Sequence, residues 1–103
     1  MTPNVDIRPF LRRGLARSSQ SSPLTLVDLI ETVDAFNKIL ATRDELNSGI
    51  SSLAETGEVS EDGSGRYFAG HGQPSIAREI DEATYRSAVT EYQPQMAERL
   101  KPS

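Results

Sequence analysis

Residues 24–70 read LTLVDLIETVDAFNKILATRDELNSGISSLAETGEVSEDGSGRYFAG, and this stretch decides the fold. Near its start, Thr25 is suited to cap a helix, and Asp28 stands three residues later in the position of a capping-box acid. The apolar residues that follow recur at the spacing of one helix face: Leu26, Leu29, Ile30 and Val33. The stretch therefore predicts an amphipathic helix, and a change of phase over residues 35–40 predicts a bend or a separate short helix.

A second helix is predicted over residues 43–56. Thr42 and Glu45 form a second capping box, and the acids of the first turn suit the positive end of the helix dipole. The inward stripe consists of Leu46, Ile50 and Leu53. Gly57 then suits the left-handed position that ends a helix.

A polar hairpin is predicted after this glycine. Residues 58–60 and 66–69 read as two short strands, and the Asp62-Gly63 pair between them is a strong turn signal. One hairpin is marginal alone, so it must lean on the helices. We expect Val59, Phe68 and Tyr67 to make that contact.

The N-terminal segment 1–22 reads as a basic arm. Pro9 is suited to start a short helix, whose apolar side would pack on the body and leave the arginines in water. Residues 18–23 read as a flexible connector to the core, which we expect over residues 23–73.

The C-terminal segment 74–103 reads as a helical extension. Ser75 is expected to cap a long helix that runs from Ile76 to about Tyr92, and Pro94 is expected to kink or end it. The apolar positions Tyr85, Val89, Tyr92, Met96 and Leu100 continue a helical stripe. This stripe is either core within the same chain or, as we favour, the contact of a homodimer.

Composition bounds the class of protein. The chain has 103 residues and no cysteine, which suits one domain in the cytoplasm and excludes disulfides and thiolate chemistry. Arginines interrupt the first 20 residues, and no run of about 18 apolar residues occurs, so neither a signal peptide nor a membrane partner is expected. The net charge of −4 divides into +3 for residues 1–20 and −7 for residues 21–103.

The pattern E-L-x3-I-x2-L-x3-G-x-V from Glu45 to Val59, followed by Arg66-Tyr67-Phe68, resembles the winged-helix branch of the helix-turn-helix proteins. The resemblance implies a mostly α, α+β fold: a winged-helix-like domain with one small hairpin and helical extensions at both ends. It also implies that the outward side of the 43–56 helix faces a partner. If that partner is DNA, the contacting residues would be Arg12, Arg13, Arg17, Arg43, Asn47, Ser48, Ser51 and Arg66, with Ser52 and Glu55 on the same helix face.

Charge separates two functional hypotheses. The 43–56 helix carries three acids against Arg43 alone, and an acidic surface repels the phosphates whose neutralisation supplies most DNA affinity. The leading hypothesis is therefore a non-enzymatic module for protein–protein interaction or assembly, with a protein partner or a second copy. The alternative is a DNA-binding transcriptional regulator that places the N-terminal arginines on phosphates.

Catalytic chemistry has little support in the sequence. His71 is the single histidine, and no second histidine or cysteine completes a zinc site. Asp28, Glu31 and Asp34 could be read as ligands of a divalent cation, but their spacing places them on the solvent side of a helix. We expect no catalytic residue, metal or cofactor, and the sequence leaves a small-molecule ligand open.

Overall fold

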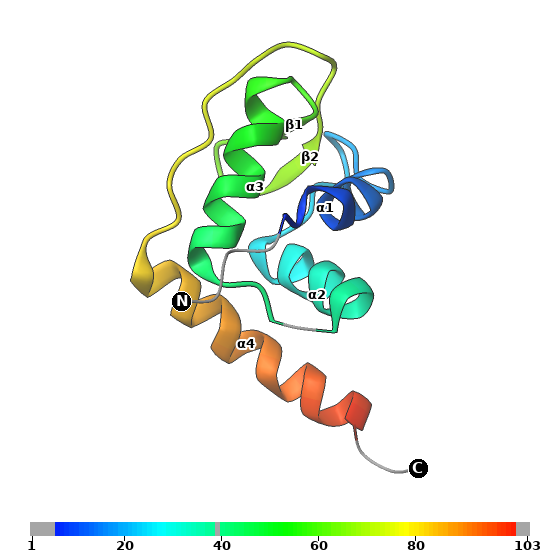
Figure 1. Ribbon diagram of the computed structural model, residues 1–103, viewed down its shortest axis with the longest axis vertical. Coiled ribbons are helices and arrows are strands. Elements are labelled where there is room, and N and C mark those ends of the chain that lie inside the picture. The colour runs from blue at the N-terminus through cyan, green and yellow to red at the C-terminus, as the bar shows by residue number, and fades with distance from the viewer. Residues whose placement is uncertain (1–5, 39, 101–103) are drawn as a thin grey trace.

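The computed structural model describes residues 6–38 and 40–100, with side chains for residues 6–36, 38 and 40–92. Within them the order is α1 (Arg8–Leu15), α2 (Leu26–Asn37), α3 (Arg43–Glu55), β1 (Val59–Glu61), β2 (Tyr67–Ala69) and α4 (Glu82–Leu100). The predicted fold class is confirmed, because the described chain is a mostly helical α+β fold with one antiparallel hairpin (Figure 1).

Helix α1 lies against both α2 and α3 (Figure 1). Pro9 stands in its first turn, where the missing N–H costs nothing. The buried side of the segment consists of Ile7, Leu11 and Leu15, each at most 3% exposed. The basic residues Arg12 and Arg13 are exposed, so the helix puts its apolar side into the core and its arginines in water, as its sequence predicts.

Both predicted capping boxes form. Thr25 accepts a hydrogen bond from the Asp28 amide, and the Asp28 carboxylate accepts one from the Thr25 amide. Thr42 and Glu45 make the same reciprocal pair at the start of α3. Helix α2 runs unbroken to Asn37 and ends with Lys38 in the left-handed region, so the described residues do not form the separate short helix expected over 35–40.

Gly57 ends α3 as predicted, with φ of 77°. The Glu58 amide donates to the Leu53 carbonyl oxygen at 2.8 Å, and the Gly57 amide donates to that of Ala54 at 3.1 Å. These two bonds satisfy carbonyl groups that the end of a helix would leave free, and they turn the chain towards the hairpin.

The hairpin pairs Val59 with Ala69 and Glu61 with Tyr67. Val59 and Tyr67 are buried and Phe68 is half-buried, so Tyr67 rather than Phe68 is the main aromatic contact with the core. Leu24 adds one residue of a third strand, since its amide donates to the Tyr67 carbonyl oxygen at 2.6 Å and its carbonyl oxygen accepts from the Tyr67 amide at 2.7 Å. This pairing supports a hairpin that would be marginal alone.

The start of the C-terminal helix differs from its prediction. Residues 76–81 are not helical, and α4 begins at Glu82, where the Asp81 carboxylate accepts a hydrogen bond from the Thr84 amide at 2.7 Å. Ser75 does not cap a helix, because its amide donates to the Ala54 carbonyl oxygen of α3 instead. The sequence predicts that Pro94 kinks or ends the helix near Tyr92, and the ending is wrong, since α4 continues to Leu100. An interior proline removes one backbone hydrogen bond and crowds the carbonyl group four residues earlier, which can bend a helix without ending it.

The apolar stripe of α4 packs within the same chain. Tyr92 is 0% exposed, and its hydroxyl donates to Asp34 of α2 at 2.5 Å. Tyr85 and Val89 are half-buried beside it, and the Tyr85 hydroxyl donates to the Ala41 carbonyl oxygen. The oligomer contact expected at Tyr92 is therefore wrong, because its ring is core. The side chains of Met96 and Leu100 lie outside the described residues.

Candidate functional site

Helix α3 is the element that the resemblance assigns to partner binding. Its inward side is buried through Leu46, Ile50 and Leu53. On its outward side Ser48 and Ser51 are exposed, while Arg43, Asn47 and Ser52 are partly covered. The covering group for Arg43 and Asn47 is a segment that the sequence did not indicate.

We call residues 71–81 the strap. It runs antiparallel to α3, because Ser75 bonds to Ala54 near the end of the helix while Ile80 bonds to Asn47 near its start (Figure 1). The Asn47 amide group makes two bonds to one residue: its oxygen accepts from the Ile80 amide at 2.7 Å, and its nitrogen donates to the Ile80 carbonyl oxygen at 3.1 Å. This pair fixes the direction in which Asn47 points.

Arg43 is held at the same place. Its guanidinium lies 3.4 Å from the Ile80 carbonyl oxygen, 3.3 Å from the Glu82 carboxylate and 4.0 Å from that of Glu79. The strap, the start of α3 and the start of α4 therefore meet around one arginine. The two α3 residues best suited to read base edges, Arg43 and Asn47, are both engaged within the chain.

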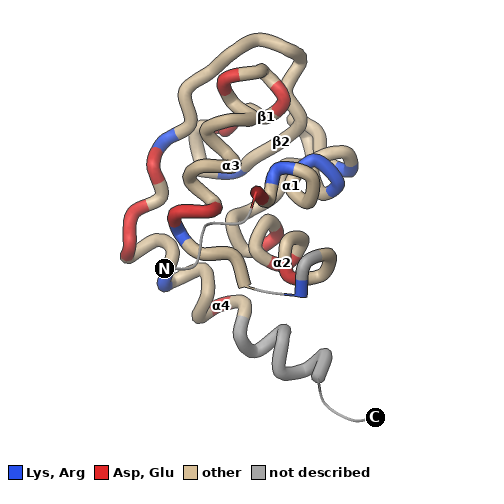
Figure 2. Tube along the Cα trace, viewed as in Figure 1, with Lys and Arg blue, Asp and Glu red and all other residues tan. Residues whose placement is uncertain are grey.

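The predicted nucleic-acid residues of the N-terminal segment lie elsewhere. Arg12 bonds to Glu58 at 2.8 Å; this bond, followed by one from the Thr56 hydroxyl, lowers the pKa of Glu58. Arg13 stacks over Phe36, and Arg17 is exposed at the end of α1. Figure 2 places the basic residues of α1 and the acidic residues near the α4 start on opposite sides of the view.

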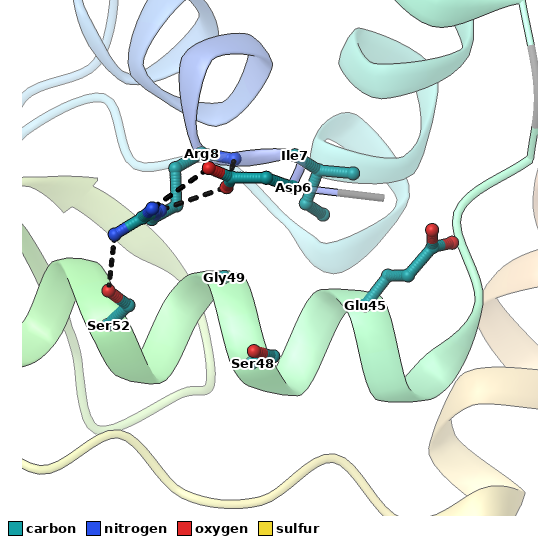
Figure 3. Close-up of a pocket in the computed structure, with 7 residues that line it drawn as sticks. All are labelled: Asp6, Ile7, Arg8, Glu45, Ser48, Gly49 and Ser52. Atoms are coloured by element: carbon teal, nitrogen blue, oxygen red, sulfur yellow. Dashed lines mark hydrogen bonds and ion pairs between the residues drawn. The ribbon is translucent and has the colours of Figure 1, made fainter. Parts of the chain in front are cut away.

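A cavity of about 370 Å³ lies between the start of α1 and α3 (Figure 3). The Arg8 guanidinium donates to both oxygens of Asp6 and to the Ser52 hydroxyl. The side-chain bond from Arg8 lowers the pKa of Asp6 to about 2. These three side chains therefore satisfy one another, and Glu45, which also lines the cavity, accepts a hydrogen bond from the Thr42 amide. No local pattern in the sequence brings these residues together.

The remaining chemical candidates have structural explanations. Asp28 caps α2, and Asp34 accepts a bond from Tyr92. His71 is exposed at the start of the strap. The described residues contain no group of three histidine, cysteine or carboxylate side chains placed to hold a metal ion. Among the same residues, no helix is both long enough and hydrophobic enough to span a bilayer.

Arg66, the last predicted nucleic-acid residue, is exposed beside the turn of the hairpin. Its backbone amide donates to the Asp62 carboxylate at 3.0 Å, which closes the turn. Comparison with protein-family models, with curated proteins and with solved structures finds no match for this chain.

Proposed function

We propose that this chain is a non-enzymatic binding module of the winged-helix type and that its partner is a protein. The sequence resemblance supports the winged-helix assignment, together with the path from α2 through α3 to a hairpin that packs back through Val59 and Tyr67. The observation that carries the choice of a protein over DNA is the bonding of Arg43 and Asn47 to the strap.

DNA recognition by α3 would require these bonds to break. Asn47 would lose both bonds to Ile80, and the backbone groups of Ile80 would have to find other partners. Arg43 would have to leave the carboxylates of Glu79 and Glu82. A base contact is worth about 1–3 kcal/mol, which is similar to what these internal bonds contribute.

The charge around the strap indicates the chemistry of the partner. Glu79 and Glu82 lie within 4.0 Å of the Arg43 guanidinium and Asp44 follows Arg43 in the chain; all three are exposed, and we call this group the acidic corner. Ile76, on the same strap, is 98% exposed. An acidic corner at one end of the strap and a large apolar side chain towards the other end fit a basic segment of a protein that also carries an apolar contact.

The test measures fluorescence anisotropy of a labelled decapeptide of alternating lysine and alanine. We expect the chain to bind it, with an affinity that falls as salt rises and that Glu79→Lys weakens several-fold. Glu91→Lys is the matched control, because Glu91 is also exposed but lies on α4, more than two helical turns beyond Glu82. Equal weakening by both variants would contradict the acidic corner.

A second arm uses a labelled random DNA duplex at about 50 mM salt, where non-specific affinity is strong. We expect no binding. Duplex binding that disappears when Arg12 and Arg13 are changed to alanine would instead support the DNA-binding regulator.

A further inference from the structure

A groove of about 240 Å³ separates α1 from α2 on a face away from the strap. Arg13 and Arg17 line its α1 side, and Asp28, Glu31 and Phe36 line its α2 side. We call this the α1–α2 groove. One wall is therefore basic and the other acidic.

The floor of the groove is a close contact between the two helices. A Cβ atom built on Gly14 would lie 2.8 Å from Thr32, so glycine is what allows this approach. Along the groove, Arg13 of α1 lies over Phe36 of α2, and Gly14 meets Thr32. Because the residue numbers rise along α1 and fall along α2 between these two contacts, the two helices run in opposite directions.

The charges of the groove do not neutralise one another. Neither Arg17 nor Glu31 makes an ion pair with any other described residue, although both line the same groove. Phe36 is 46% exposed, and the Arg13 guanidinium carbon lies 5.2 Å from the centre of its ring. The groove thus presents an unpaired cation, an unpaired anion and half of an aromatic ring to solvent.

We propose that the occupant of this groove is the same groove of a second copy. The surface is complementary to itself: a two-fold axis lying along the groove brings the α1 wall of one copy over the α2 wall of the other. Arg17 of each copy then faces the acidic α2 wall of its partner, where Glu31 is the unpaired carboxylate, and Arg13 of each copy faces the exposed side of Phe36 in its partner. A two-fold axis across the groove would place like charges together, so charge selects the first arrangement.

This interface goes beyond the proposed function. It uses neither the strap nor the acidic corner, and it differs from the α4 contact that the sequence suggested. Failure of the lysine peptide to bind would leave the dimer standing. Failure of the dimer would likewise leave the peptide result standing.

The test is sedimentation equilibrium of the full chain at about 0.1 M salt. At that ionic strength the net charge of −4 on each copy is screened beyond roughly 10 Å, while contacting pairs persist. We expect a concentration-dependent dimer that Arg17→Glu and Glu31→Arg each weaken at least tenfold, because a two-fold interface contains every altered pair twice. Asp28 is left unchanged because it caps α2.

Mixing the two variants separates this geometry from a general charge effect. In a mixed dimer the new carboxylate at position 17 faces the new guanidinium at position 31, and the two original partners face each other. We therefore expect the equimolar mixture, and the double variant carrying both changes, to dimerise about as well as the original chain.

The matched controls are Arg66→Glu and Glu55→Arg, which change the net charge equally at exposed positions outside the groove. We expect them to leave the dissociation constant within about twofold. A chain that stays monomeric up to millimolar concentration would overturn the proposal. So would a dimer that R17E does not weaken, or a mixture that fails to restore it.

Discussion

Among single residues, Gly57 has the most restricted environment. Its φ of 77° costs a residue with a side chain about 1–2 kcal/mol. A Cβ atom there would also lie 2.2 Å from the backbone carbon of Gly72, in the loop that packs over the end of α3. We expect Gly57→Ala to lower the free energy of unfolding by about 2–5 kcal/mol, the conformational cost added to that of overpacking. Urea denaturation followed by circular dichroism measures it.

Gly65 supplies the matched control for this prediction. Its φ of 78° is almost the same, but a Cβ atom there would meet nothing within 4 Å. Gly65→Ala should therefore lose only the conformational part, about 1–2 kcal/mol. Equal losses in the two variants would show that the contact with Gly72 is unimportant.

Tyr67 predicts how stability depends on pH in the alkaline range. Burial, followed by the carboxylate of Glu61 on the neighbouring strand, raises the pKa of Tyr67 to about 12. The folded chain favours the neutral phenol of Tyr67. The contribution of this preference to the free energy of unfolding is therefore complete below the unfolded pKa of about 10, and it is lost as pH rises from there through 12. We expect Tyr67→Phe to remove this part of the decline in unfolding free energy, measured in urea at several pH values. A pH profile parallel to that of the original chain would contradict the burial argument.

At the scale of elements, the features that the sequence predicted correctly are ones formed by local hydrogen bonds, although the local cap that starts α4 at Asp81 was missed. The capping boxes at Thr25 and Thr42, the end of α3 at Gly57 and the hairpin turn at Asp62 each involve residues at most five apart. Their chemistry is visible in a short stretch of sequence.

The strap could not be predicted in this way. The Ser75-Ile76 pair resembles a cap followed by an apolar position, but Ile76 is 98% exposed and has no core to face. The bonds that hold the segment extended join Ser75 to Ala54 and Ile80 to Asn47, across more than 20 residues of chain. Hydrogen bonds between segments so distant in the chain compete with helix formation, and they leave no recognisable pattern in the local sequence.

The start of α4 gives the prediction that belongs to this scale. Asp81→Ala removes the hydrogen bond to the Thr84 amide, so we expect a lower urea midpoint and faster amide exchange in the first turn of α4. Ser75→Ala is the control, and it should change neither quantity, because only the backbone of Ser75 bonds to α3. If the helix began at Ile76, the two results would be exchanged.

For the whole molecule, the candidate sites also depend on contacts between distant segments, which the sequence alone does not predict. Helical spacing predicted which residues of α3 face away from its buried stripe, but Ser52 of that set bonds to Arg8 and Asn47 bonds to the strap. The engagement of Arg43 and Asn47 by the strap, and the two charged walls of the α1–α2 groove, arise only where distant segments meet. Helical spacing gives the face on which a side chain lies, whereas the neighbour that meets it is set by tertiary packing.

One hydrophobic core joins the described chain from Ile7 to Tyr92, and this core decides whether α1 behaves as a separate arm. Leu11 is 0% exposed inside it, so we expect Leu11→Ala to cost about 2–5 kcal/mol. Far-UV circular dichroism and tyrosine fluorescence should shift together, because the loss destabilises one cooperative unit that includes Tyr67 and Tyr92. Gln20→Ala, an exposed change beyond the end of α1 and outside the α1–α2 groove, should cost less than about 0.5 kcal/mol. Two transitions, with the fluorescence transition unmoved by L11A, would mean that the N-terminal helix folds on its own and that the rest of the core does not need it.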